Sequence, residues 1–207
     1  IRGYKIKKNV KIGIGSVIIS KDVEIGENTS IGFGTVIRAE KIRIRRFVRI
    51  GSFTFIDTGN FFVDDDSKIN EQVIIAGIKK PESSLIMGKR TTIMEYSYIN
   101  PTMPISIGDD SGIGGHCLLF THGSWLNQLD GYPVKFAPIK LGKNVWLPWR
   151  VFIMPGVEIG NNVVVGADSL INKSFSSNLL IAGSPAKVIK DNFPDKPSNE
   201  SRNNLMK

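Results

Sequence analysis

An aliphatic residue recurs at about every sixth position of this chain, and this spacing limits the possible folds more than any other feature. The first run is Ile12, Ile19, Ile25, Ile31, Ile37, Ile44, Ile50 and Ile56, with two intervals of seven. The last run keeps six throughout: Leu141, Leu147, Ile153, Ile159, Val165 and Ile171. Between them lie Met87, Ile93 and Ile99, then Ile107, Ile113 and Leu119. A period of six is neither that of a helix nor that of a simple strand.

A short strand followed by a turn, repeated many times, accounts for this period. Such hexapeptide repeats resemble the left-handed parallel β-helix, in which three hexapeptides form one triangular coil of about 18 residues. The aliphatic side chains point to the axis, and the small or polar residues that follow turn the corners. One coil cannot stand alone, so many must stack. We expect an all-β fold: a left-handed parallel β-helix over residues 1–190, with one extruded loop and a short C-terminal tail.

Three segments depart from the repeat. The period fades across residues 57–84, which indicates irregular coils or an inserted loop. Residues 123–138 interrupt it directly after His122 and include three aromatic residues: Trp125, Tyr132 and Phe136. Because exposed aromatic side chains favour association, we expect this loop to lie at an interface. Residues 191–207 are polar and contain two prolines, so we expect a disordered or loosely docked tail.

Composition limits the class of protein. The chain has 207 residues, enough for one domain with a sizeable core. No apolar run approaches the ~20 residues that span a bilayer, so we expect no integral membrane segment. No signal peptide opens the chain, although it starts at Ile1 and a processed start stays open. The single cysteine, Cys117, can form no intrachain disulfide, which favours a cytoplasmic location.

The net charge of +8 favours an anionic partner. The densest basic segment is Arg38 to Arg49, where Ile42 and Ile44 alternate with arginines as on a strand with one buried face. A solvated outer face is the simpler interpretation. Phe47 is the only aromatic residue there, which disfavours binding of single-stranded nucleic acid.

A series of short motifs in the second half occurs in a fixed order. It comprises Thr121-His122, a loop ending at Pro138, Asn144-Val145-Trp146, Pro155-Gly156-Val157, Gly166-Ala167 with Ser169, and Ala182-Gly183-Ser184-Pro185-Ala186-Lys187. Together they resemble the hexapeptide-repeat acyltransferases, most of which transfer acetyl from acetyl-CoA. The branch concerned contains the maltose and galactoside acetyltransferases and the O-acetyltransferases of surface polysaccharides. The resemblance is strongest over residues 105–190.

The resemblance implies that His122 is the general base, because histidine titrates near neutral pH and can take the proton of an attacking hydroxyl. It offers two further candidates for acceptor binding. His116 lies six residues earlier, and a corner or interface role is the alternative for it. Glu95 stands where the family often has Asn, and it could orient His122 or the acceptor. Cys117 follows the apolar pattern, so we expect it to be buried and not a nucleophile.

The resemblance also implies a site for acetyl-CoA. Four residues would hold its phosphate end, namely Ser184, Pro185, Lys187 and Lys190. Ala167 and Asp168 would lie along the pantetheine arm, and Trp146 beside the same groove. The chain departs from the family twice, at Leu147-Pro148-Trp149-Arg150 and at Asp168, where bulk and a carboxylate replace glycines that commonly admit the arm.

Family members are homotrimers with active sites between subunits, so the resemblance implies the same here. We expect an acetyl-CoA-dependent O-acetyltransferase that acts on a sugar or a surface-polysaccharide precursor. The metal-dependent carbonic anhydrases of this fold need three histidine ligands, and the chain has two histidines, so we expect no metal. The main alternative is a non-catalytic β-helix scaffold or binding protein that uses the basic segment Arg38 to Arg49.

Overall fold

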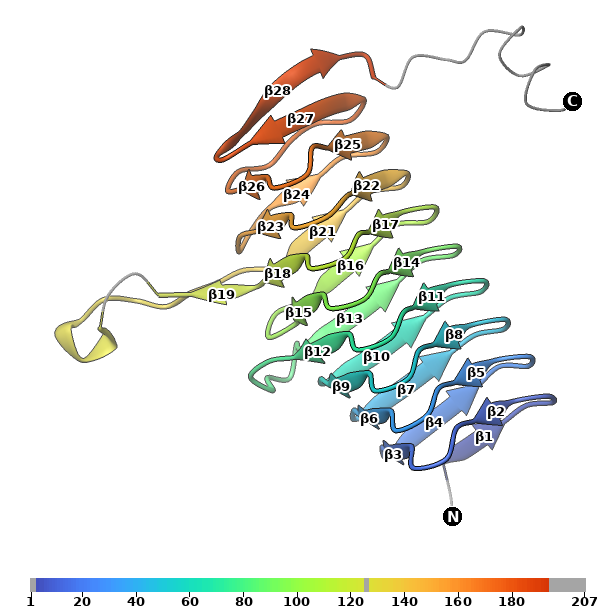
Figure 1. Cartoon of the computed structure of the whole chain (residues 1–207). Helices are drawn as coiled ribbons and strands as arrows, with labels where there is room; N and C mark the ends of the chain where they lie inside the picture. Colours follow the sequence, from blue (N-terminus) through green and yellow to red (C-terminus); the bar gives the residue numbers. More distant parts are fainter. Residues whose placement is uncertain (1–2, 125–126, 194–207) are drawn as a thin grey trace, which may run out of the picture.

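The computed structural model describes residues 3–124 and 127–193, and it confirms the left-handed parallel β-helix (Figure 1). Short strands follow one another in threes, and every third strand joins the same sheet one coil further along. Three parallel sheets therefore form the sides of a triangular prism, here called sheets A, B and C in the order in which the chain visits them.

Each sheet is a column of strands from successive coils. Sheet A contains β1 (Tyr4–Ile6), β4 (Asp22–Ile25), β7 (Lys41–Ile44), β10 (Asn60–Val63), β13 (Ser84–Met87), β16 (Ile105–Ile107), β21 (Ile139–Leu141) and β24 (Glu158–Ile159). Sheet B contains β2 (Lys11–Ile12), β5 (Ser30–Ile31), β8 (Arg49–Ile50), β11 (Lys68–Ile69), β14 (Thr92–Ile93), β17 (Gly112–Ile113), β22 (Val145–Leu147), β25 (Val163–Val165), β27 (Leu179–Gly183) and β28 (Ala186–Asp191). Sheet C contains β3 (Val17–Ile19), β6 (Val36–Arg38), β9 (Phe55–Asp57), β12 (Ile74–Ala76), β15 (Tyr98–Asn100), β18 (Leu118–Phe120), β23 (Phe152–Ile153) and β26 (Leu170–Ile171).

The periodic aliphatic residues form the axis of the prism, as the repeat predicts. All members of the last run are at most 4% exposed, and those of the first run from Ile25 onward at most 3%. The prediction is wrong at Ile19, which faces outward and is 56% exposed. Ile18 is the inward residue, because it pairs with the buried Ile37, whereas Ile19 pairs with Arg38.

The intervals of seven fall at one corner of the prism. With Ile18 as the inward residue, they separate Ile18 from Ile25 and Ile37 from Ile44, where the chain turns from sheet C to sheet A. The register Val17↔Val36 then gives early coils 19 residues long, not 18. The added residue lengthens one corner and leaves the stacking of the three sheets intact.

The segment 57–84 consists largely of a regular coil. It contains β10, β11 and β12, and their inward side chains Phe61, Ile69 and Ile75 are fully buried. Residues 77–83 form an insertion at the corner between sheets C and A. Val63 keeps the aliphatic position of the repeat, because it pairs with Ile44 and Met87, and the period fades only where this insertion shifts the following coil.

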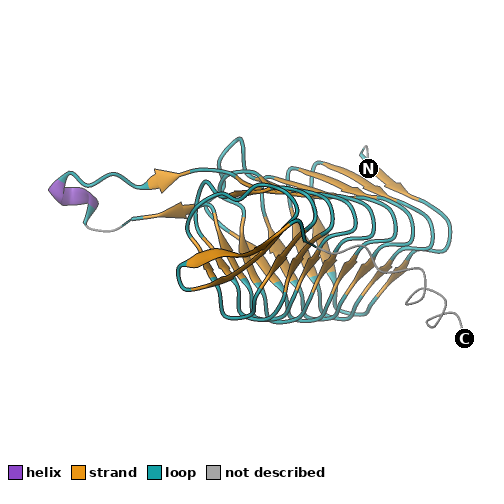
Figure 2. Ribbon diagram, turned by 90° about the horizontal axis from the view of Figure 1, so that it is seen from above, coloured by secondary structure: helices purple, strands orange, loops and turns teal. Residues whose placement is uncertain are grey.

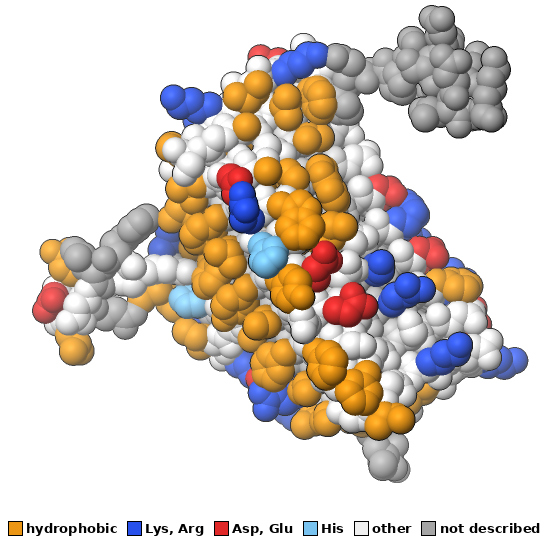
Figure 3. Space-filling model, in the orientation of Figure 1, with side chains coloured by type: hydrophobic (Ala, Val, Ile, Leu, Met, Phe, Trp, Pro, Cys, Tyr) orange, Lys and Arg blue, Asp and Glu red, His pale blue; other side chains and the backbone are white. Residues whose placement is uncertain are grey.

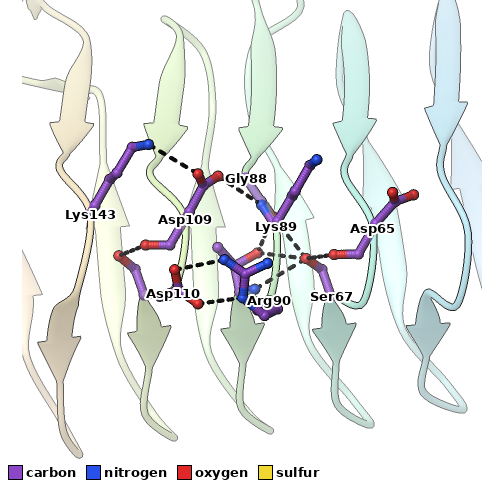
Figure 4. A network of polar contacts seen from close by, with 10 residues as sticks. Asp65, Ser67, Gly88, Lys89, Arg90, Asp109, Asp110 and Lys143 are labelled. Atoms are coloured by element: carbon purple, nitrogen blue, oxygen red, sulfur yellow. Dashed lines mark hydrogen bonds and ion pairs between the residues drawn. The ribbon is translucent and has the colours of Figure 1, made fainter.

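The corner between sheets A and B carries a ladder of ion pairs and hydrogen bonds (Figure 4). Arg90 binds Asp110 through both carboxylate oxygens, at 2.5 and 2.8 Å, and Lys143 Nζ lies 3.1 Å from Asp109. The guanidinium of Arg90 lowers the pKa of the Asp110 carboxyl. These partners belong to successive coils, so the ladder bonds the coils along the prism; as exposed pairs they contribute little stability individually.

The predicted extruded loop leaves the prism between β18 and β21. Its base is an antiparallel pair, β19 (His122–Gly123) and β20 (Lys135–Phe136), and a short 3₁₀ helix η1 (Gln128–Asp130) lies further out. Seen from above, this arm projects well beyond the triangular outline of the coils (Figure 2). Trp125 and the tail beyond residue 193 lie outside the described residues.

Candidate active site

His122 occupies the corner between sheets C and A, at the base of the arm. Thr121 fixes the backbone before it: its buried hydroxyl donates to the Asn100 carbonyl at 2.7 Å and accepts from the Met103 N–H at 2.9 Å. The Thr121 carbonyl also accepts a hydrogen bond from the Ala137 N–H at 2.9 Å. The chain therefore leaves and re-enters the prism at a fixed point, and His122 is the first residue beyond it.

The imidazole of His122 is held by packing. Its ring lies against the ring of Phe136, with centroids 5.7 Å apart and planes inclined by 18°. Its Nδ1 atom is buried and has no hydrogen-bond partner among the described residues. A buried polar atom without a partner is uncommon in native proteins and often marks a functional group.

A pocket of about 290 Å³ lies beside His122. Its walls are mostly apolar, and a few polar groups converge on it, as is typical of small-molecule sites. The lining residues are Phe120, His122, Gly123, Ser124, Lys135, Phe152, Met154, Pro155 and Asn172. They come from coils on either side of the arm and from both strands at its base.

The insertion 77–83 supports the arm from the other side. Its Lys80 places Nζ 3.4 Å from the centroid of the Phe136 ring, on which His122 stacks. The insertion is itself fixed by Thr102, which accepts from the Ile78 N–H at 2.9 Å and from the Ser83 hydroxyl at 2.9 Å. Sequence reasoning named neither Lys80 nor Lys135 as a site residue; the irregularity of 57–84 was the only signal for Lys80.

Glu95 and His116 lie at a different corner, between sheets B and C. Glu95 accepts a hydrogen bond from Asn70 Nδ2 at 2.8 Å, which is the main reason that its pKa is lowered. His116 is exposed and stacks between Tyr96 and Trp149, with ring centroids 5.0 and 5.6 Å away. Neither residue lines the pocket of His122, so the structure does not bring these two acceptor candidates to the predicted base within one chain.

The predicted donor-site residues on the coils lie on sheet B and on the B–C corner. Trp146 is half-exposed on the outer face of β22, and a Cβ at Gly112 would collide with its indole. Ala167 and Asp168 follow β25 at the corner. Arg150 binds the Asp168 carboxylate at 2.5 and 2.6 Å and lowers its pKa. The negative charge of this carboxylate is therefore balanced by the guanidinium.

Trp149, which belongs to the other segment that departs from the family pattern, lies at the same corner. Its indole covers Gly115, where any Cβ would collide with it, and its far side contacts His116. The two glycines below Trp146 and Trp149 thus admit indole rings that side chains there would exclude.

The remaining donor-site candidates form the final hairpin, β27 with β28. Ser184 and Pro185 make its turn and are joined by a cis peptide bond. Lys187 pairs with Ala182 and is exposed, and Lys190 pairs with Leu180 and places Nζ 5.9 Å from the Phe193 ring. This hairpin extends sheet B, so the phosphate-binding candidates continue the column that carries Trp146.

The predicted donor residues and His122 therefore lie on different sides of one prism. Sheet C separates the B–C corner from the corner that carries His122. Within a single chain the two groups are therefore kept apart by the width of sheet C.

The basic segment Arg38 to Arg49 does not form one patch. It runs through β6, β7 and β8 and so around all three sheets. Four of its arginines have acidic partners: Arg38 with Asp57, Arg43 with Asp22, Arg45 with Glu24 and Arg46 with Asp65. This arrangement supports the solvated-face interpretation and gives the scaffold alternative no continuous binding surface.

The described residues offer neither a metal-binding cluster nor a membrane-spanning helix. Within residues 3–124 and 127–193, no group of three or more His, Cys, Asp or Glu side chains is placed to hold a metal ion. In the same part of the chain, no helix has the length and hydrophobicity needed to cross a bilayer.

Comparison with known proteins agrees with the fold. No protein-family model matches the chain. Over 130 residues it is 28% identical to WcaF of Escherichia coli K12, which is provisionally named a colanic acid biosynthesis acetyltransferase; the match covers 60% of this chain and 69% of that protein.

Two solved structures are also similar. The polysialic acid O-acetyltransferase OatWY matches with a TM-score of 0.63 and 25% identity, covering 97% of this chain and 95% of that one. A galactoside acetyltransferase in complex with coenzyme A matches with a TM-score of 0.51 and 28% identity, covering 57% and 59%. The coils, the motif series and these relatives identify the chain as an acyltransferase of the hexapeptide-repeat class.

Proposed function

We propose that this protein transfers an acetyl group from acetyl-CoA to a hydroxyl of a sugar or a surface-polysaccharide precursor. The observation that carries the proposal is the half-buried imidazole of His122 at the wall of a ligand-sized pocket, with Nδ1 lacking a protein partner. The named activities of the similar proteins support the same donor and the same class of acceptor.

In the proposed reaction His122 is the general base. It accepts the proton of the acceptor hydroxyl as the oxygen attacks the thioester carbonyl, and the carbon–sulfur bond then breaks. The proton passes to the departing thiolate, so that an acetyl ester and coenzyme A are formed. No covalent enzyme intermediate is needed, and Cys117, which is fully buried, takes no part.

We further propose that the active unit is a homotrimer. One column of outward side chains on sheet C is apolar along the prism, and Figure 3 shows hydrophobic side chains gathered on this face. The side chains concerned are Val17, Val36, Phe55, Ile74, Tyr98, Leu118, Phe152 and Leu170. An apolar face of this extent is typical of a protein interface. Association through sheet C would bring the donor residues of one copy beside His122 of the next.

Calorimetric titration of coenzyme A and acetyl-CoA tests the donor. We expect binding by the wild type and by His122→Ala, and weaker binding by Lys187→Ala, because Lys187 is assigned to the phosphate end. Lys41→Ala is the matched control, since Lys41 is also exposed but lies on sheet A. Absence of binding at millimolar concentrations would contradict the proposal and favour a non-catalytic protein.

A further inference from the structure

The pocket beside His122 has an unbalanced charge. Its lining contains one charged side chain of fixed sign, Lys135, and no carboxylate. The remaining polar groups are the imidazole of His122, the Ser124 hydroxyl and the Asn172 amide. A ligand in this pocket therefore meets a cation that the lining does not neutralise.

Lys135 is held in place from two sides. It belongs to β20 and pairs with Gly123 next to His122. Its Nζ and Cε lie 3.6 Å from the position that a Cβ on Gly156 would take, so its side chain extends across the glycine that follows Pro155.

Lys135 has no acidic partner among the described residues, unlike four other lysines of the protein. Lys21, Lys79, Lys140 and Lys143 each lie within 3.1 Å of an acidic side chain. No carboxylate lies within 4.0 Å of Lys135 Nζ in the described part of the chain. The second lysine near His122, Lys80, faces the ring of Phe136. The surroundings of the predicted base are thus positively charged.

The apolar walls suit the ring of a saccharide. Phe120 and Phe152 pack edge to face, with centroids 5.8 Å apart, and Met154 and Pro155 continue the surface. Such a wall can contact the C–H face of a sugar, while the Asn172 amide of the lining can bind its oxygens.

We propose that the acceptor is an anionic saccharide, whose carboxylate binds Lys135 while one of its hydroxyls lies at His122. This inference rests on the proposed O-acetyltransferase function and specifies its acceptor. A charge-assisted hydrogen bond to Lys135 would favour the anionic acceptor by about 10- to 100-fold over a neutral one. A neutral sugar would leave the lysine of the pocket without a partner, which adds to the discrimination.

The test uses two acceptors that differ only at C6: methyl galactopyranosiduronate, which carries a carboxylate, and methyl galactopyranoside. Polygalacturonate and its methyl ester form the equivalent polymer pair. For each pair, kcat/KM is measured with saturating acetyl-CoA for the wild type, Lys135→Gln and the control Lys41→Gln. We expect the wild type and the control to prefer the carboxylated member, and Lys135→Gln to lose that preference through a higher KM for the carboxylated acceptor.

Equilibrium binding of the same probes, measured by saturation-transfer NMR, separates this inference from the proposed function. Carboxylate binding that depends on Lys135, without acetyl transfer, would overturn the function and keep the anion site. Acetyl transfer without preference for the carboxylated member would overturn the anionic acceptor and keep the function. A raised KM for acetyl-CoA in Lys135→Gln would assign the lysine to the donor phosphates and would also overturn the inference.

Discussion

The rings of His122 and Phe136 stack at the base of the arm, and the two residues also pair with each other where β19 joins β20. Histidines that act as bases are usually oriented by a hydrogen bond to the second ring nitrogen. In this protein Nδ1 has no such partner among the described residues, so the orientation comes from aromatic packing and from Lys80 beyond it. The geometry of the proposed base therefore depends on the arm and on the insertion 77–83 together.

The first prediction concerns the base itself. His122→Ala should lower turnover by about 10²- to 10⁴-fold, the usual contribution of a general base, without loss of folding. His116→Ala is the matched variant, because it removes the other histidine from a stack outside the pocket, and it should have a much smaller effect. Steady-state kinetics and circular dichroism of both variants provide the measurement; equal rates for wild type and His122→Ala would exclude the assigned role.

The second prediction concerns the support of that base. Phe136→Leu should lower kcat by about 10-fold or more with little change in the KM for acetyl-CoA, because small displacements of a catalytic group are costly. Phe136→Tyr keeps the stacked ring and should restore most of the rate. Loss of activity in both variants, or in neither, would show that the stack does not orient His122.

The third prediction concerns assembly. Leu118→Glu places a carboxylate on the outer face of sheet C, where burial in an interface without a partner would cost several kcal/mol. We expect light scattering to show a trimer for the wild type and smaller species for the variant, together with weakened coenzyme A binding. Ser106→Glu, on the outer face of sheet A, is the control and should remain trimeric. A variant with unchanged mass would place the interface elsewhere.

Much of the fold follows from the sequence because one side chain per hexapeptide must enter the axis. The repeat identifies nearly every buried aliphatic residue of the long runs, and it fails where two isoleucines are adjacent. Ile18 and Ile19 have the same hydrophobicity, so only the pairing of Ile18 with Ile37 decides which one faces inward. Likewise, the repeat alone could not show that Val63 is followed one coil later by Met87, because the insertion 77–83 lengthens the spacing between them.

The candidate site was less accessible to sequence reasoning. His122 stands out because it interrupts a period, and its position at the arm base follows from that. Lys80 and Lys135 approach it from segments 42 and 13 residues away in sequence, and no local pattern connects them with it. Glu95 and His116 belong to coils near that of His122, but they lie at the corner between sheets B and C. The place of a residue along its coil decides at which corner of the prism it lies.

The last prediction concerns Cys117. Burial raises the pKa of its thiol from the ordinary 9.0 to about 11, and the thiol donates a hydrogen bond to the Pro148 carbonyl at 2.9 Å. Between these two values the folded state holds more protons than the unfolded state, so stability should fall as the pH rises from about 9 to 11, by about 2 to 3 kcal/mol. Urea unfolding of the wild type and Cys117→Ala across this range measures the difference in slope. At pH 8 the native thiol should stay protonated and resist alkylation, whereas rapid labelling under native conditions would contradict its burial.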